Sequence, residues 1–355
     1  MIEAIVASLA LKGGTRLLRA AVEDRDLSRA DASEMATALL DAIVTGQRKT
    51  NTDLQRIEQK IDDAREDPYH AAMTSGAILL QDAAPAHRRP EHRQAMLDDA
   101  RLRFADAKAA AKTRPVDLAR AHVMYGLTWL ALGEPQDFTA ALHSAIRILQ
   151  QEALTAFQLM CQWERDQERR RAAPATRIRE VIAGPDVISD WSASNRWQQA
   201  QTEHDGAWEL YVLSHETCPY PRLDRPHGSA YSHPRPGLPV YGSFGKTVRL
   251  LDADVTLSSA DLTVANHGAT YVRAELVPSV MDSEKVVSPD VSALDRAGTM
   301  VRPGENVRLS YTGSGRPAAC LFLGQAERVD LLVLLHNEFD RSSPMEQMLR
   351  PFRKN

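Results

Sequence analysis

The chain has 355 residues, a formal net charge of −4 at pH 7 and three cysteines. A chain of this length predicts about two domains, each able to bury its own core. The slightly acidic charge balance, and the lack of a basic stripe with interleaved aromatic residues, argue against nucleic acid as a partner.

The cysteines and the first residues indicate a cytoplasmic protein. Cys161, Cys218 and Cys320 lie far apart, so they predict neither a disulfide framework nor a zinc site. The start of the chain lacks the basic leader and small-residue cleavage site of a secretory signal. No apolar run reaches the roughly 18 to 20 residues of a membrane-spanning helix.

Residues 1–23 predict a first helix that is apolar on more than one side and is interrupted by Gly13-Gly14. One face carries Ile2, Ile5, Val6 and Leu9. Three interpretations stay open for this helix: burial in the core, release into a membrane, or contact with another subunit.

Residues 31–65 predict one long helix, which ends before Asp67-Pro68 because a proline disfavours helical geometry in the residue before it. Its apolar positions follow the 3-4 spacing of a coiled-coil seam. The seam consists of Ala36, Leu40, Ile43, Gln47, Thr50, Leu54, Ile57, Ile61 and Ala64. Such a seam pairs with another helix of this chain, with a partner helix or with a second copy.

Residues 116–147 predict two helices joined by a tight turn at Gly133, and the second helix continues to about residue 171. Gly126 leaves room for a neighbouring helix, and Trp129 follows on the same face. The second helix carries an apolar stripe of Phe138, Leu142 and Ala145. An upstream echo places Gly76 and Leu79 on a helix at residues 69–82, and Ala100, Phe104 and Ala107 on a helix at residues 91–112.

This order of small, aromatic and turn residues resembles the tetratricopeptide repeat, over about residues 69–147. The chain departs from the family pattern at Phe138, where alanine is usual, and at Gln150, where proline is frequent. The resemblance implies a helical groove for a protein partner, with Tyr125, Trp129, Phe138 and Leu142 as candidate contact residues. The alternative is an ordinary helical bundle in which these residues form the core.

Residues 174–245 form the predicted connector. Residues 189–213, with three tryptophans, predict a short helix and a strand over the domain junction. Residues 214–245 are rich in proline, which predicts that they contain no central strand or helix. A stretch of this length suggests a functional loop or a packed arm.

From Lys246 onward, residues alternate with the period of strands, most clearly at Val307, Leu309 and Tyr311. Strands are predicted at residues 247–251, 261–264, 270–277, 305–311, 318–323 and 329–335. The turns at Asn266-His267-Gly268 and at Pro303-Gly304 resemble those of Ig-like β-sandwich modules. We expect a sandwich over residues 246–340 and a polar tail over residues 341–355.

No candidate for chemistry in the sequence is specific, so we predict no catalytic, cofactor-binding or metal-binding residue. Residues 242–247 resemble a phosphate-binding loop but have the wrong glycine spacing, and a strand is predicted where that loop needs a helix. A cysteine with a nearby histidine can act as a nucleophile, so Cys218 and His215 make a hydrolase a third hypothesis. The remaining candidates are Glu216, His227, His233, Asp252, Asp254 and His336-Asn337-Glu338, and Cys320 is expected in the core.

The sequence therefore predicts an α+β chain with a helical domain at residues 1–173, a connector at 174–245 and an antiparallel β-sandwich at 246–340. The leading functional hypothesis is a non-enzymatic protein that binds a protein partner or self-associates through its helical module, with the sandwich as a second recognition surface and without a cofactor. The alternative is a membrane-active effector that inserts Ile2, Ile5, Val6 and Leu9 and associates peripherally with the membrane. For that alternative, the apolar first helix on a helical bundle resembles HeLo-like cell-death effectors, over about residues 1–80.

Overall fold

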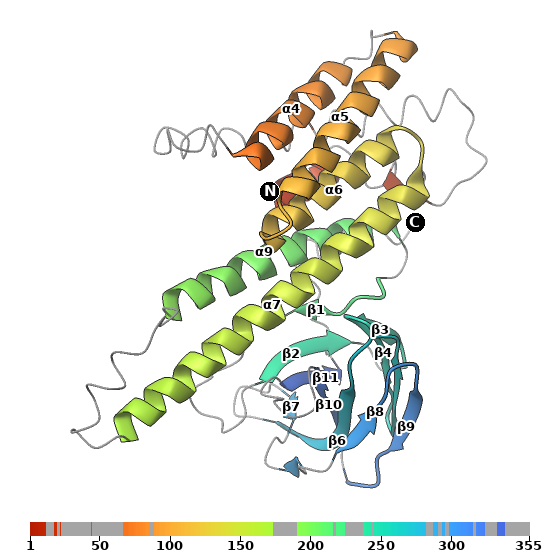
Figure 1. The fold of residues 1–355 in the computed structure, drawn as a ribbon. Helices are drawn as coiled ribbons and strands as arrows, with labels where there is room; N and C mark the ends of the chain where they lie inside the picture. Colours follow the sequence, from red (N-terminus) through yellow and green to blue (C-terminus); the bar gives the residue numbers. More distant parts are fainter. Residues whose placement is uncertain are drawn as a thin grey trace. The chain divides into compact units, whose positions relative to one another are not determined.

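The chain forms two compact units, a helical unit at Met1–Tyr220 and a β unit at Pro221–Asn355 (Figure 1). The structure is a computed structural model. It describes residues 1–11, 18–19, 22, 44, 67–84, 89–172, 190–215, 218–223, 237–242, 245–281, 287–289, 293–294, 298–314, 317–323 and 332–337. Helices followed by two largely antiparallel sheets confirm the α+β class.

Prolines and polar caps set where the helices of the helical unit begin. The described helices are α1 (Ile2–Leu11), α4 (Pro68–Ala83), α5 (Pro90–Ala110), α6 (Pro115–Ala131), α7 (Pro135–Ala172) and α9 (Asp190–Ser214). The helices α4 to α7 each begin at a proline, whose missing N–H is no loss in the first turn. The Asp67 side chain accepts a hydrogen bond from the Tyr69 N–H at 2.9 Å and so caps α4. Gly133, with φ of 86°, ends the turn after α6 as predicted.

Three glycines inside helices mark the closest helix crossings. A Cβ at Gly76 of α4 would lie 2.7 Å from the Phe104 ring of α5, and a Cβ at Gly126 of α6 would lie 2.9 Å from Ala141 of α7. The sequence predicted both close approaches. A third, at Gly206 of α9, places Glu3 N of α1 only 2.9 Å from an added Cβ. These glycines fix how α4 packs on α5, α6 on α7 and α1 on α9.

The helix α9 corrects the prediction of a short helix and a strand at residues 189–213. One continuous helix forms there because its buried residues recur every three or four positions. They are Ala193, Trp197, Ala200, Glu203, His204, Gly206, Ala207, Leu210, Tyr211, Leu213 and Ser214. Three of them, Glu203, His204 and Ser214, are polar, and they hid this periodicity in the sequence. Because α9 packs on α7 and α6, the helical unit extends to Tyr220, beyond the predicted border at residue 173.

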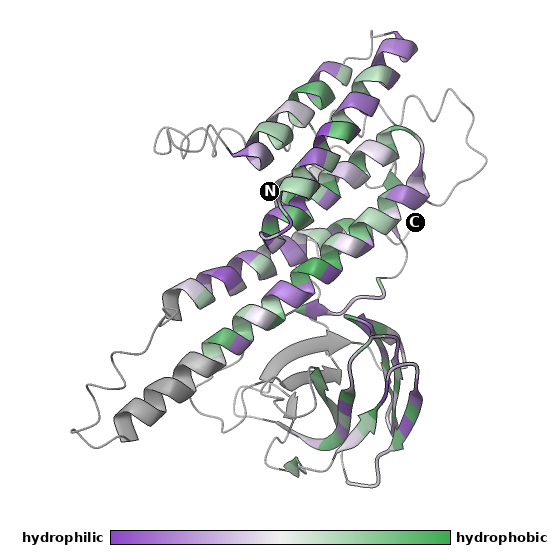
Figure 2. Cartoon of the chain, viewed as in Figure 1, coloured by the Kyte–Doolittle hydropathy of each residue, from purple (hydrophilic) through white to green (hydrophobic). Residues whose placement is uncertain are grey.

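The β unit contains two sheets. One has the order β1-β2-β11-β10-β6-β7, with β8 paired to β6, and the other has the order β3-β4-β5-β9. The predicted strands correspond to β3 (Thr247–Leu250), β5 (Asp261–Asn266), β6 (Val272–Met281), β9 (Asn306–Ser310), β10 (Pro317–Leu323) and β11 (Leu332–Asn337). The others are β1 (Arg222–Leu223), β2 (Gly237–Gly242), β4 (Ala253–Leu257), β7 (Val287–Pro289) and β8 (Thr299–Val301). Hydrophilic and hydrophobic residues alternate along β9 in Figure 2, as predicted, whereas β10 is buried along both faces.

The strand β2 contradicts the prediction that the proline-rich stretch holds no central strand. It pairs in parallel with β11 on one side and antiparallel with β1 on the other. The two residues of β1 face only Val240 and Tyr241. Pro239 is therefore opposite no residue of β1, and its missing N–H donor is tolerated there as on an edge strand.

Several predictions lie outside the described residues. These concern the interruption at Gly13-Gly14, the seam at residues 36–64, Glu216, His227, His233, Glu338 and the tail at residues 341–355.

Candidate functional site

A row of aromatic and cationic side chains lies where α5 and α6 pack against each other, and we call it the α5–α6 stripe. The Arg101 guanidinium of α5 lies 4.6 Å from the ring centroid of Trp129 on α6. One further contact, Lys108 Nζ to the Tyr125 ring, measures 4.1 Å. The two rings are 6.0 Å apart and edge-to-face, and both are half-buried. The stripe thus pairs each aromatic ring with one cation from the neighbouring helix.

The charge of the stripe is positive. Arg101 has an ion pair with Asp98 at 3.6 Å, whereas Lys108 has no carboxylate within ion-pair distance in the described part of the chain. His122 lies one turn before Tyr125 on α6. Its burial, together with the charge of Lys108, lowers the pKa of His122 to about 4, so this histidine is neutral at physiological pH.

The structure divides the four candidate groove residues. Tyr125 and Trp129 reach the surface on the stripe. Phe138 and Leu142 are core side chains, exposed by 0% and 1%, and the Phe138 ring packs against Gly126. Of these four residues, only Tyr125 and Trp129 can contact a partner in this conformation.

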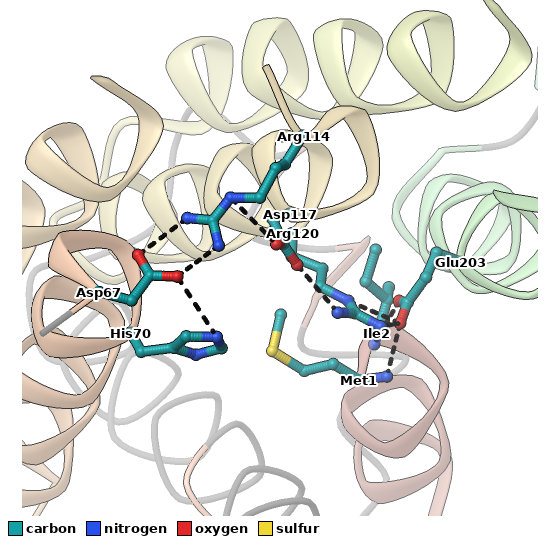
Figure 3. A network of polar contacts seen from close by, with 8 residues as sticks. All are labelled: Met1, Ile2, Asp67, His70, Arg114, Asp117, Arg120 and Glu203. Atoms are coloured by element: carbon teal, nitrogen blue, oxygen red, sulfur yellow. Dashed lines mark hydrogen bonds and ion pairs between the residues drawn. The ribbon is translucent and has the colours of Figure 1, made fainter. Parts of the chain in front are cut away.

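A buried carboxylate, that of Glu203, holds three segments of the helical unit together (Figure 3). Glu203 is 2% exposed. It accepts hydrogen bonds from the Met1 ammonium at 2.9 Å, from the Ile2 N–H at 3.1 Å and from Arg120 Nε at 2.9 Å. Burial alone would raise the pKa of Glu203, but Arg120 and the ammonium outweigh it and hold the pKa below its ordinary value. Glu203 therefore stays ionised and links α9 to α1 and α6.

The network continues from Arg120 to α4. Arg120 Nη1 contacts Asp117 at 3.1 Å, and Asp117 contacts Arg114 Nε at 3.6 Å. Arg114 Nη2 donates to Asp67 Oδ1 at 3.0 Å, which lowers the pKa of Asp67, and His70 lies 3.8 Å from the same carboxylate. Every carboxylate in this chain of contacts faces an arginine, so the network is suited to stabilising the fold and offers no free acid or base.

The N-terminal helix α1 is packed inside the helical unit. Ile2, Ile5 and Val6 are each 0% exposed, and Ile2 lies against Gly206 of α9. The side chain of Leu9 is outside the described residues. Insertion of this face into a membrane would require α1 to leave α9. None of the described helices is long and apolar enough to cross a membrane.

Cys218 and His215 have different partners. The ring nitrogens of His215 lie 3.1 Å from Thr139 Oγ1 and 2.7 Å from Ser214 Oγ, and none of the described hydrogen bonds joins His215 to Cys218. Burial raises the pKa of the Cys218 thiol to about 12, the opposite of what a nucleophile needs. This arrangement gives the hydrolase hypothesis no support.

The other candidates also have structural environments. Asp254 accepts hydrogen bonds from Arg249 at 2.8 and 2.9 Å and from His267 at 3.1 Å, whereas Asp252 lies in the turn before β4. Cys320 is buried in the core as predicted. In the segment compared with a phosphate-binding loop, residues 242–247, the strand β3 begins at Thr247, where such a loop needs a helix. His336 and Asn337 are the last two residues of β11. Within the described ranges, no three His, Cys, Asp or Glu side chains are placed to hold a metal ion.

Sequence reasoning missed Arg101, Lys108, Arg120 and Glu203. The spacing of Arg101 and Lys108, two turns apart on one helix, was a signal that they share a face. The spacing did not indicate which aromatic residues of another helix these two cations would contact. Comparison of the chain with protein-family models, with curated proteins and with solved structures found no match.

Proposed function

We propose that this chain is a non-enzymatic interaction protein that docks a partner polypeptide along the α5–α6 stripe. The observation that carries the proposal is the pair of half-buried rings, Tyr125 and Trp129, each covered by a cation of α5. Tyrosine, tryptophan and arginine are the residues in which binding energy concentrates at protein interfaces. Their juxtaposition at one helix pair favours docking over a purely structural role.

The contacts between the rings and the cations order the four side chains of the stripe before a partner binds, which lowers the entropic cost of binding. The helices α5 and α6 that carry the stripe also share, with α4, a core cluster of Tyr69, Ala107, Ala111 and Ala121, all buried. The tandem hairpins are the coarse architecture that the tetratricopeptide resemblance implies, and they support a groove-type interaction in the proposal.

We further propose that the β unit adds a second recognition surface. Among its described residues, Tyr271 and Met300 are the exposed large hydrophobic ones, at 44% and 39%. Met300 is the register partner of Arg273, so these two residues share one face of the sheet, and Tyr271 directly precedes β6. Tyrosine, methionine and arginine are enriched at interfaces.

Self-association through the same stripe is the alternative within this class. Membrane insertion of α1 is the alternative from another class, and nothing in the described residues favours it over burial.

A random peptide library displayed on phage tests the proposal. The library is selected in parallel on the intact chain, on Trp129→Ala and on Leu102→Ala. Leu102 is the matched control because it is 53% exposed on α5 and makes none of the stripe contacts. We expect the same peptides to be enriched on the intact chain and on Leu102→Ala and lost on Trp129→Ala, with circular dichroism confirming that all three are folded. Enrichment that is equal on all three, or absent from the intact chain, would refute docking at the stripe.

A further inference from the structure

We infer that the segment docking on the α5–α6 stripe is acidic and presents two carboxylates to Arg101 and Lys108. This inference rests on the proposed function and adds the chemistry of the partner. Both cations are only partly satisfied within the chain. Arg101 shares a single carboxylate, that of Asp98, and Lys108 meets none among the described residues.

Stacking on an aromatic ring leaves each cation able to bind an anion. A guanidinium over a ring uses its flat face, so the Nη groups of Arg101 keep their in-plane N–H donors for an anion, whereas its Nε is buried. An ammonium has three N–H donors and uses one side over the Tyr125 ring. The rings thus hold both cations in place without satisfying their hydrogen-bonding capacity.

The spacing of the cations defines the spacing of the carboxylates. Arg101 and Lys108 are seven residues apart on α5, which corresponds to about 10 Å along a helix. Ala105 lies between them on the same face and is half-buried, so only a methyl group occupies the intervening surface. A partner would match this distance with acidic residues about seven positions apart in a helix, or about three apart in an extended strand.

An acidic polypeptide fits better than a nucleic acid. Asp98 lies beside Arg101 on the stripe, and the whole chain carries a net charge of −4. A long polyanion would meet this repulsion along its length, whereas a short acidic segment meets mainly the two cations.

Peptides of defined sequence test the inference by fluorescence anisotropy. Stripe-dependent peptides from the phage selection are synthesised with their acidic residues intact and with each replaced by the neutral amide. A short oligothymidylate is the polyanion probe. The proteins are the intact chain, the double variant Arg101→Gln and Lys108→Gln, and the control Arg103→Gln. Arg103 is a suitable control because it is 55% exposed on α5 and has its own partner, Asp106.

We expect selected peptides to be rich in Asp and Glu. On the intact chain, the amide peptides should bind on the order of tenfold more weakly than the acidic peptides. The acidic peptides should bind the double variant on the order of tenfold more weakly than the intact chain, and should bind Arg103→Gln with unchanged affinity. Peptides that bind through Trp129 but contain no acidic residues, or that bind the double variant as tightly as the intact chain, would overturn the inference and leave the proposed function standing. Oligothymidylate binding that requires Arg101 and Lys108, without acidic-peptide binding, would overturn it in favour of a nucleic acid. A selection without any stripe-dependent peptide would remove both proposals.

Discussion

In the helical unit the Glu203 carboxylate is buried and accepts hydrogen bonds from an ammonium, a backbone N–H and a guanidinium. In the β unit the Asp254 carboxylate is about a quarter exposed and faces Arg249 and His267, which are about half exposed. Both carboxylates have pKa values below the ordinary range. Only Glu203 joins segments that are far apart in the sequence, so only its loss should disturb tertiary packing.

Glycine serves two different purposes at Gly206 of the helical unit and at Gly245 and Gly304 of the β unit. Gly206 is needed because a neighbouring helix backbone lies against it. Gly245 and Gly304 have φ of 74° and 77° and nothing within 4 Å of an added Cβ, so they are needed for turn geometry alone. Gly206 is therefore required by a long-range contact, whereas Gly245 and Gly304 are required by local backbone conformation.

The largest expected effect comes from Glu203→Gln, which keeps the shape of the side chain and removes its charge. We expect a loss of about 2 to 4 kcal/mol in the free energy of unfolding, because Arg120 and the ammonium lose their buried partner. The loss should fall short of the upper limit for a broken buried pair, because Arg120 is 31% exposed and keeps Asp117. Denaturant unfolding followed by circular dichroism at helical wavelengths measures it. If Glu203→Gln lowered the free energy of unfolding no more than Asp254→Asn does, burial would not distinguish the Glu203 carboxylate from the Asp254 carboxylate.

The substitution Gly206→Ala sets helix propensity against crowding. Alanine favours a helix by about 1 kcal/mol over glycine, but its methyl group would lie 2.9 Å from the Glu3 backbone nitrogen. Since a backbone atom cannot rotate away, overpacking of about 1 to 3 kcal/mol should prevail. Faster proteolysis within α1 is the expected readout. Gly245→Ala, the matched turn variant, should leave proteolysis of α1 unchanged, and a more stable Gly206→Ala would contradict the close crossing.

Acid should remove the contribution of Glu203. Its pKa in the folded chain is below its ordinary value of 4.5, so its stabilisation is complete above that value and is lost as pH falls through the lower, folded value. The difference in unfolding free energy between the intact chain and Glu203→Gln should be constant near neutral pH and shrink below about pH 4.5. A difference that does not change with pH would show that the carboxylate is not the stabilising group.

The smallest expected effect is that of Asp254→Asn. An ion pair as exposed as this one contributes less than about 1 kcal/mol, because water and salt screen it. A double-mutant cycle with Arg249→Gln measures the coupling between the two side chains, and the coupling should weaken further in high salt. A coupling as large as that between Arg120 and Glu203 would erase the contrast between the two units.

Local signals in the sequence predicted much of the fold. The helices predicted at residues 69–82, 91–112 and 116–147, with the turn at Gly133, correspond to α4, α5, and α6 with α7. The alternation at Val307 and Leu309 identified β9. Each signal acts within one or two helical turns or along one strand, so the local structure that it predicts does not depend on which elements pack against it. The continuous helix α9 was missed because Glu203 and His204 stand at buried positions, where polar residues break the expected apolar pattern.

Two of the four residues of the candidate site, Tyr125 and Trp129, were predicted from the sequence, whereas Arg101 and Lys108 were missed. The sequence by itself determined that Tyr125 and Trp129 share one face of a helix, because the helical period fixes the angle between residues four apart. Only the tertiary structure decided that this face reaches the surface beneath Arg101 and Lys108, that Phe138 and Leu142 are buried, and that Glu203 meets the start of the chain. The reason is physical: periodicity gives the direction of a side chain relative to its own helix, whereas burial, charge pairing and pKa depend on neighbours that the chain brings from far away in the sequence.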